Sequence, residues 1–371
     1  MSKWAEEIHE SPWQGVFYLT GGGGLLVSDL LTTAGASSTA LEIHIPYSSK
    51  SLSELISKKE EKAVSENVSR QLSVSAFLRA RELSDYSQNK VFGLGLTASL
   101  STKEAKRGQT QARWCIQTMD STFSFKIILE KQSSRQEQEI NLLEALQKTI
   151  SYALLKEEWQ NSNEAIARQE FHAPPVWQKL FLDEICSNPT KEHNGKLVFP
   201  GSFNPLHDGH VEMLERAEKI TGLRGSFEIT VVNSDKPPLD YLTLSERING
   251  LSKYPVWVTN AGTFDQKIGL FPSATFVVGA DTILRIADPK FYENDPVMLE
   301  DALDRIYKSR IKFLVFGRLI NEKFMELKDL DIPKALLDCC DSVPQNLFRN
   351  DISSTKIRKS NSPRLPNKGY I

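Results

Sequence analysis

Several features that would narrow the class of this protein are absent from its 371 residues. No run of about 18 apolar residues occurs, so no membrane-spanning helix is expected. Lys and Arg number 45 against 47 Asp and Glu, and the formal net charge of −2 gives no bulk electrostatic affinity for nucleic acid. The first residues, MSKWAEEIHE, are acidic and lack an apolar stretch, so we expect no signal peptide.

Cysteine is also scarce. The chain has 4 cysteines, and none shows CxxC or Cys/His metal-ligand spacing. We interpret the vicinal pair Cys339 and Cys340 as core-facing thiols rather than a disulfide, which suits a reducing compartment. The sequence therefore predicts a cytoplasmic protein, with the nucleus as the alternative location.

Length and composition predict a two-domain globular protein. A chain of 371 residues exceeds one usual core, and 40% hydrophobic with 25% charged residues is ordinary globular composition. Apolar residues recur with helical period over 135–159, and a polar stretch then precedes Pro174-Pro175. We predict a first domain over 1–160, a linker with a connecting helix over 161–194, and a second domain over 195–371 with a flexible tail. In the first domain the pattern predicts strands at 15–19, 41–45 and 90–97, a hairpin-like pair at 112–119 and 124–129, and a helix start at 25–31.

Residues 201–210 read GSFNPLHDGH and follow a short apolar run, KLVFP. The pattern predicts a buried strand, a tight turn and an amphipathic helix, VEMLERAEKI. Gly201 lets the turn present backbone N–H groups to an anion, and the helix start adds free amides and a positive dipole end. His207 and His210 could then hydrogen-bond phosphoryl oxygens as charge develops on them. The alternative is a plain strand–turn–helix with two surface histidines.

A second polar segment, DISSTKIR, lies at 351–358. Hydroxyl side chains at a helix start cap free amides and can also hold phosphate oxygens. Arg358 lies about one helical turn further along and could reach the same anion with its planar fork of donors. The alternative is an ordinary Ser/Thr cap followed by a solvated basic turn.

Together the two segments resemble the HxGH and ISSTxIR motifs of the nucleotidylyltransferase superfamily. Between them, VGADT at 278–282 resembles the GxD segment of nicotinamide mononucleotide adenylyltransferases, and TLSERI at 243–248 resembles the start of their substrate-side helix. The resemblance implies an α/β fold with a Rossmann-like parallel sheet that binds the nucleotide where the strands end.

The resemblance also implies the chemistry. An NTP, ATP or another, would donate its nucleotidyl group to a mononucleotide or other phosphorylated acceptor with release of pyrophosphate, and nicotinamide mononucleotide giving NAD is the best assignment. Mg²⁺ should bridge the phosphates, held by nucleotide and water, with no metal site built by the protein. The residues expected to be catalytic are His207, His210 and Arg358. The residues expected to bind the nucleotide are Gly201, Ser202, Phe203, Gly209, Lys236, Gly279, Asp281, Ser353, Ser354 and Thr355.

The role of Asp281 and the absence of a tryptophan after it leave the acceptor open. Asp281 would face the acceptor's ribose or amide, or it would cap the next helix. The mononucleotide enzymes often place a tryptophan shortly after this segment to stack on nicotinamide, but here the window holds Phe291 and Tyr292, which could stack or pack in the core. Lys236 would contact a phosphate or lie solvated in a loop. A cytidylyltransferase for a different acceptor is therefore an alternative.

The first half shows a separate resemblance. TGGGGLLVSDLLTTAGASS and IPYSSK resemble the CinA C-terminal domain, the fold of nicotinamide mononucleotide amidohydrolases. That family has a serine two residues before the Thr-Gly-Gly, where this chain has Tyr18. Because a nucleophile must lie within about 0.5 Å of its attack geometry, we expect this half to lack amidohydrolase activity. The TGGGG loop could still bind phosphate through backbone amides, or it could be only a tight turn.

Two further protein classes are alternatives. Class I aminoacyl-tRNA synthetases share a His-x-Gly-His turn but carry a KMSKS-type loop, where this chain has ISSTKIRKS. The non-enzymatic alternative is a nucleotide sensor or scaffold that binds ligands without turnover. Since domains of both resembled families often self-associate, the resemblance also predicts a homo-oligomer.

Overall fold

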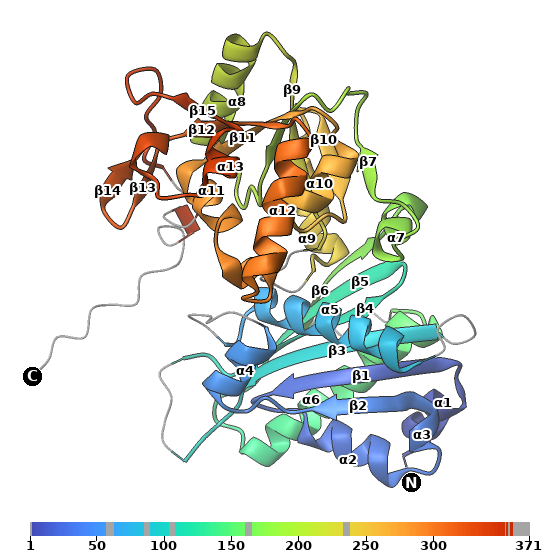
Figure 1. Cartoon of the computed structure of the whole chain (residues 1–371). Coiled ribbons are helices and arrows are strands. Elements are labelled where there is room, and N and C mark those ends of the chain that lie inside the picture. Colours follow the sequence, from blue (N-terminus) through green and yellow to red (C-terminus); the bar gives the residue numbers. More distant parts are fainter. Residues whose placement is uncertain are drawn as a thin grey trace, which may run out of the picture. The chain divides into compact units, whose positions relative to one another are not determined.

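The computed structural model describes residues 2–56, 63–84, 90–103, 108–159, 165–232, 238–352, 354 and 357–358 (Figure 1). The chain forms two compact units, each built around one sheet. The first comprises Met1–Gln178 with Asp235–Thr243, and the second comprises Lys179–Ser234 with Leu244–Ile371. No helix of the described part is long and apolar enough to cross a membrane.

The first unit contains a six-stranded sheet with the order β2-β1-β3-β4-β5-β6. The strand β1 is parallel to both neighbours, whereas β3 to β6 form an antiparallel meander. The strands are β1 (Trp13–Thr20), β2 (Ala40–His44), β3 (Lys90–Ser99), β4 (Gln111–Thr118), β5 (Ser121–Ile128) and β6 (Ile166–His172). The predicted hairpin is confirmed as β4 and β5. The stretch expected to link the halves contains β6, which extends the first sheet.

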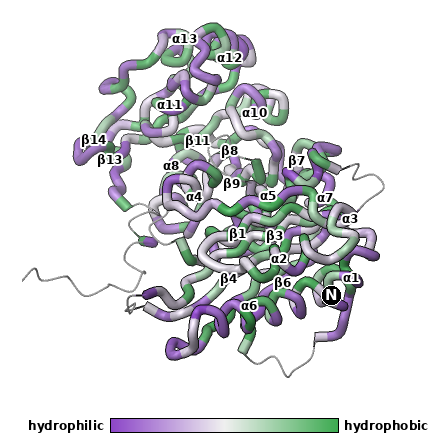
Figure 2. The backbone as a smooth tube through the Cα atoms, turned by 90° about the horizontal axis from the view of Figure 1, so that it is seen from below, coloured by the Kyte–Doolittle hydropathy of each residue, from purple (hydrophilic) through white to green (hydrophobic). Residues whose placement is uncertain are grey.

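Helices cover both faces of this sheet (Figure 1). One core joins β1, β3, β4 and β5 to α1 (Lys3–Glu10), α2 (Gly24–Thr32), α6 (Arg135–Ile150) and the π-helix Ser151–Leu155 that continues α6. The other joins β1 and β3 to α4 (Ser49–Leu55) and α5 (Glu66–Leu83). A short helix, α3 (Ala36–Thr39), precedes β2. Figure 2 accordingly shows β3 as largely hydrophobic, as expected for a strand buried on both faces.

Glycine allows α5 to approach β3 closely. A Cβ atom added to Gly93 would overlap backbone atoms of Ser73 and Phe77, and one added to Gly95 would overlap the backbone of Ser69. Any larger residue at these two positions would push the helix away from the sheet, because backbone cannot yield as a flexible side chain can.

The segment Asp235–Thr243 belongs to the first unit although the chain on both sides of it belongs to the second. Tyr241 is fully buried there: its backbone N–H donates to Oγ1 of Thr122 at 3.1 Å, and its hydroxyl donates to the carbonyl of Met119 at 2.6 Å. The Arg70 guanidinium donates to Oγ1 of Thr243 at 3.5 Å. The first unit is thus completed by residues far along the sequence.

The second unit contains a seven-stranded sheet with the order β15-β12-β11-β8-β9-β10-β7, parallel except for β7. Its strands are β7 (Ser187–Pro189), β8 (Leu197–Pro200), β9 (Gly225–Thr230), β10 (Val256–Thr259), β11 (Thr275–Gly279), β12 (Lys312–Phe316) and β15 (Cys340–Val343). A small hairpin, β13 (Arg318–Ile320) and β14 (Lys323–Met325), follows β12. The helices are α7 (Pro175–Phe181), α8 (Asp208–Thr221), α9 (Tyr241–Gly250), α10 (Phe264–Leu270), α11 (Ala280–Ile286), α12 (Pro296–Lys308) and α13 (Lys334–Leu337), of which α7 and α9 begin in the first unit's residues.

This strand order confirms the predicted Rossmann-like parallel sheet. The chain runs outward from β8 through β9 to β10, then returns to the other side of β8 and continues through β11, β12 and β15. Ligands of such sheets bind at the carboxyl ends of the strands, at the point where the order reverses. Here that point lies between β8 and β11, so the loops after these two strands are the ones that the topology selects.

A buried ion pair lies inside the second unit. Nζ of Lys267 is 2.6 Å from Oε1 of Glu228, and the side chains are 5% and 1% exposed. Lys267 also donates to the carbonyl of Ala261 at 2.8 Å, and the hydroxyl of Thr259 donates to the same carboxylate. The two charges are therefore paired and hydrogen-bonded, as burial requires.

Candidate functional site

The turn after β8 positions the two histidines. Gly201 has no room for a side chain, because a Cβ atom there would lie 2.6 Å from Cζ of the buried Phe203 ring. The Gly201 N–H donates to the carbonyl of Glu228 at 3.0 Å, which continues the sheet rather than facing a ligand. Thus the glycine serves to admit Phe203, whose ring packs edge-on against His210 with centroids 5.1 Å apart. Ser202 is exposed.

His207 caps the N-terminus of α8, and His210 lies in the first turn of that helix. The His207 N–H donates to Nδ1 of His210 at 3.4 Å, so the proton of the neutral His210 ring is on Nε2. Burial, the neighbouring His207 and the Arg318 charge together lower the pKa of His210 from 6.5 to about 3. His210 is consequently a neutral hydrogen-bond donor at physiological pH.

The His207 ring has an unusual environment. Burial and the Arg318 charge lower its pKa as well. Both ring nitrogens are buried, yet neither has a hydrogen-bond partner among the described residues. A buried polar atom without a partner is costly, and such atoms in native proteins often mark a place where a ligand or water binds.

The C-terminal motif comes to the same turn. The Ser354 hydroxyl donates to the carbonyl of Pro205 at 3.0 Å, and Arg358 donates to the carbonyl of Asn204. These two carbonyls lie two and three residues before His207 in the chain. Three other predicted site residues lie outside the described part of the chain: Lys236, Ser353 and Thr355.

Asn350 fixes the approach of this C-terminal segment to α8. Its side-chain amide donates to Oε2 of Glu212 at 3.0 Å. It also lies directly over Gly209, where a Cβ atom would be 3.1 Å from Cγ of Asn350 and 3.1 Å from Nδ1 of His207. Gly209 therefore keeps the space between the helix start and the C-terminal segment open.

The ends of β11 and β12 contribute the third part of the site. Gly279 ends β11, and a Cβ atom there would overlap the Asp281 carboxylate and lie 2.9 Å from Cγ of Arg318. Nε of Arg318 is 3.6 Å from Oδ1 of Asp281, and the guanidinium donates to the carbonyl of Ile352 at 3.5 Å. Arg318 thereby touches the GAD and DISST segments, and its charge also acts on both histidines.

Sequence reasoning missed Arg318. Its signal was an apolar run followed by Gly and then Arg, FLVFGR at 313–318, which resembles the apolar run and glycine of the GAD segment. The carboxyl ends of neighbouring parallel strands share one edge, so a cation after β12 is well placed to reach the residues after β11.

The two candidate stacking residues differ in environment. Tyr292 is buried and donates to the carbonyl of Ile286 at 3.1 Å, and burial raises its pKa to about 12. It is therefore a core residue. Phe291 is partly exposed and lies under two cations, Arg285 at 5.0 Å and Lys290 at 4.7 Å from its ring centroid.

In the first unit, Tyr18 and the TGGGG loop, the two features singled out in the CinA-like half, form hydrogen bonds with other residues of the same unit. Tyr18 is buried, its hydroxyl donates to Oε1 of Glu42 at 3.5 Å, and burial raises its pKa to about 12. In the TGGGG loop, the Gly23 N–H donates to Oε2 of Glu139 at 2.9 Å. At least this amide of the loop is thus satisfied by a carboxylate of α6.

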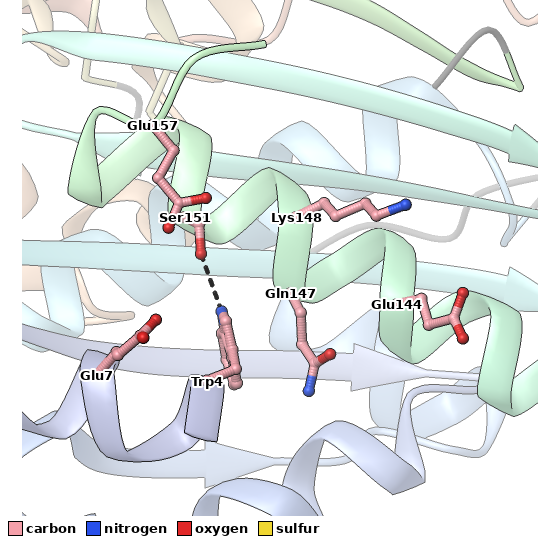
Figure 3. A pocket seen from close by; sticks show the side chains of 7 residues that line it. All are labelled: Trp4, Glu7, Glu144, Gln147, Lys148, Ser151 and Glu157. Atoms are coloured by element: carbon pink, nitrogen blue, oxygen red, sulfur yellow. Dashed lines mark hydrogen bonds between the residues drawn. The ribbon is translucent and has the colours of Figure 1, made fainter. Parts of the chain in front are cut away.

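Two of the cavities in the described part of the chain lie elsewhere. One, of about 290 Å³, is bordered in the first unit by α1, α6 and the π-helix (Figure 3), and its lining residues are Trp4, Glu7, Glu144, Gln147, Lys148, Ser151 and Glu157. The Trp4 indole donates to Oγ of Ser151 across it at 3.0 Å. The other, of about 310 Å³, is lined in the second unit by Glu192, His193, Asn194 and Arg224. Neither includes a residue predicted for the site.

Comparison with known proteins gives a family match within the second unit. Residues 198–360 match the family model described as Cytidylyltransferase-like. These residues form a cytidylyltransferase-like domain. The predicted resemblance of this half to the nucleotidylyltransferases is confirmed, and the matched range includes both histidines and the C-terminal motif.

Two curated relatives carry the same description. A protein of Prochlorococcus marinus (strain MIT 9215), described as phosphopantetheine adenylyltransferase, is 40% identical over 65 residues, which are 16% of this chain and 38% of the relative. One of Lactiplantibacillus plantarum with the same description is 30% identical over 112 residues, 29% of this chain and 64% of the relative. The chain therefore spans less than two thirds of each of these relatives.

Among the solved structures that resemble this chain are CinA-like competence or damage-inducible proteins, which correspond to its N-terminal part. The competence damage-inducible protein A from Klebsiella pneumoniae has a TM-score of 0.34 at 13% identity, covering 42% of this chain and 94% of that structure. The protein CihA from Agrobacterium tumefaciens has a TM-score of 0.35 at 16% identity, covering 41% and 94%.

Proposed function

We propose that the second unit transfers a nucleotidyl group, most simply the adenylyl group of ATP, to a phosphorylated acceptor with release of pyrophosphate. The observation that carries this proposal is the meeting of two motifs far apart in the sequence. Ser354 and Arg358 bind the carbonyls of the turn that leads into His207 and His210. Both groups thus lie at the carboxyl end of β8, where the strand order selects a ligand site.

The proposed reaction needs no covalent enzyme intermediate. An oxygen of the acceptor phosphate attacks the α-phosphorus in line, the new O–P bond forms as the bond to the β-phosphate breaks, and pyrophosphate leaves with that electron pair. Nε2–H of the neutral His210 donates to one phosphate oxygen. The ring N–H of His207 donates to another, because neither ring nitrogen of His207 has a partner in the described chain. Catalysis is then positioning and charge stabilisation, as in other phosphoryl-type transfers.

Mg²⁺ is part of the proposal as a partner of the nucleotide. Among the residues that the structure describes, no three His, Cys, Asp or Glu side chains come together as a metal site. In the proposal its ligands are phosphate oxygens and water, a usual arrangement for this ion. Bound there, it would neutralise charge on the polyphosphate.

Two acceptors are favoured by different observations. Gly279 and Asp281, in the segment that resembles the mononucleotide enzymes, favour nicotinamide mononucleotide and hence NAD as product. The printed activity of the curated relatives favours phosphopantetheine. A nucleotide sensor without turnover and a cytidylyltransferase remain the alternatives to be tested beside them.

A pyrophosphate-release assay on the full chain tests the proposal. ATP and CTP are each offered with nicotinamide mononucleotide, nicotinic acid mononucleotide, phosphopantetheine and phosphocholine. We expect turnover with at least one pair, and His210→Ala should lower kcat by roughly 10²–10³, the loss typical of one transition-state donor. His193→Ala is the matched control, because His193 lines a cavity of the same unit that includes none of the predicted site residues.

The outcomes separate the alternatives. Turnover only with CTP would make the protein a cytidylyltransferase. Bound nucleotide without any pyrophosphate release across the panel would favour the sensor. If His210→Ala turned over like the wild type while melting normally, the role given to that imidazole would be wrong.

A further inference from the structure

Arg318 lies among three motifs without belonging to any of them. It starts β13 directly after the carboxyl end of β12, and its side chain is 24% exposed. On one side its guanidinium faces Asp281, with Nε 3.6 Å from Oδ1. On another it donates to the carbonyl of Ile352, at the start of the C-terminal motif.

The pairing of Arg318 with Asp281 is weak. The contact is 3.6 Å long and the Asp281 side chain is 52% exposed. Exposed ion pairs of this kind contribute little, because water competes for both charges. A polyphosphate carries several negative charges on closely spaced oxygens, and a guanidinium fork binds such oxygens better than it binds a single carboxylate oxygen at this distance.

The histidines show where such an anion would lie. His207 has two buried ring nitrogens without partners in the described chain, and His210 presents Nε2–H as a donor. The Arg318 charge acts on both rings. An anion that accepts hydrogen bonds from the histidines would therefore come within the field of the guanidinium as well.

We propose that Arg318 is a phosphate-binding and positioning residue that exchanges partners: it pairs with Asp281 until a polyphosphate binds beside His207 and His210, and it then binds the polyphosphate. The exchange releases the Asp281 carboxylate. Resting on the proposed function, this makes nucleotide binding a precondition for Asp281 to contact the acceptor, so that the nucleotide strengthens acceptor binding. By linkage, the acceptor strengthens nucleotide binding by the same factor.

Calorimetric titration of the full chain with inorganic tripolyphosphate tests the exchange without assuming any reaction. Arg318→Met should weaken binding by roughly 10- to 100-fold, the loss expected when one charged donor group is removed. Arg318→Lys should recover only part of it, since a lysine keeps the charge but not the fork. Arg224→Met is the matched control, because Arg224 lines the cavity beside His193 and not the proposed anion site. This variant should bind tripolyphosphate with the affinity of the wild type.

Asp281→Asn tests the competition directly. It should tighten tripolyphosphate binding, because Arg318 no longer has a competing carboxylate and the anion meets less repulsion. In the Arg318→Met background, Asp281→Asn should increase the affinity for tripolyphosphate much less. The difference between the two gains measures the coupling of the two residues.

Results that overturn the exchange differ from those that overturn the transferase. If Arg318→Met bound tripolyphosphate within about twofold of the wild type, or if Asp281→Asn gained equally in both backgrounds, the exchange would be wrong whatever the reaction. If the variants changed tripolyphosphate binding as expected but no pair of nucleotide and acceptor released pyrophosphate, the transferase proposal would be wrong and the anion site would still be supported.

Discussion

The imidazole rings of His207 and His210 stack on each other, with centroids 3.7 Å apart and planes inclined by 24°. Two protonated rings this close would repel strongly, and both rings are partly or largely removed from water. The pair is therefore built to be neutral, with His210 fixed as an Nε2–H tautomer by the His207 backbone. A neutral donor pair can bind a polyphosphate without exchanging protons with solvent.

This arrangement predicts a pH dependence of stability. The pKa of His210 in the folded protein is about 3, below its ordinary value of 6.5, so the unfolded chain binds the proton more readily. His210 therefore stabilises the fold above pH 6.5, and that contribution falls as the pH drops from 6.5 towards 3. Urea unfolding of the wild type and of His210→Gln across this range measures it, because the carboxylates that also titrate there cancel in the difference.

The same comparison can fail in one clear way. A difference between wild type and His210→Gln that stays constant from neutral to acidic pH would show that the folded His210 titrates normally. The stacked pair would then be protonated as readily as an exposed histidine.

Gly279→Ala should impair binding without unfolding the protein. The φ of Gly279 is −84°, which any residue adopts, so no backbone strain arises. The new Cβ would instead overlap the Asp281 carboxylate and crowd Arg318. We expect kcat/KM for the proposed transfer to fall at least about tenfold, a loss that misplacing a substrate-positioning side chain readily causes, while the melting temperature changes little.

Gly269→Ala is the control for this prediction. Gly269 lies in α10 with open space around its Cβ position, so alanine there should be neutral or stabilise by about 0.4–1 kcal/mol. Equal activity of the Gly279→Ala and Gly269→Ala enzymes would contradict the steric explanation.

Lys267→Met should destabilise the second unit by about 3–5 kcal/mol, since it leaves the buried Glu228 carboxylate without its cation. Replacing both residues, Lys267→Met with Glu228→Leu, should recover much of the loss because no charge is then buried. Chemical denaturation of the three proteins gives the comparison. If Lys267→Met alone were as stable as the wild type, water would have to reach this ion pair.

The sequence predicted the parts of the site that depend on local pattern. An apolar run followed by glycine predicts His207 and His210 at a strand end, and Ser354 and Arg358 of the C-terminal motif donate to carbonyls of the turn before them. The position of the histidines follows from turn chemistry, whereas the approach of the C-terminal motif was implied by the resemblance to the nucleotidylyltransferases. The roles assigned to these side chains stay predictions until the assays are done.

Other parts depended on packing that no local pattern reveals. Gly201 was expected to offer its amide to an anion, but that N–H donates within the sheet and the glycine admits Phe203 instead. Arg318 was missed because its partners come from three separate loops. Glu139 was not linked to the TGGGG loop, since more than a hundred residues separate it from Gly23.

The burial of Tyr241 has a consequence for how such a protein can be divided. A truncation after residue 178 would remove the tyrosine that fills the space beside Thr122 and Met119, and would expose a surface that the intact polypeptide never shows to water. The two units consequently cannot be separated by a single cut in the chain. A functional graft of the N-terminal half onto another protein would have to carry the nine residues Asp235–Thr243 with it.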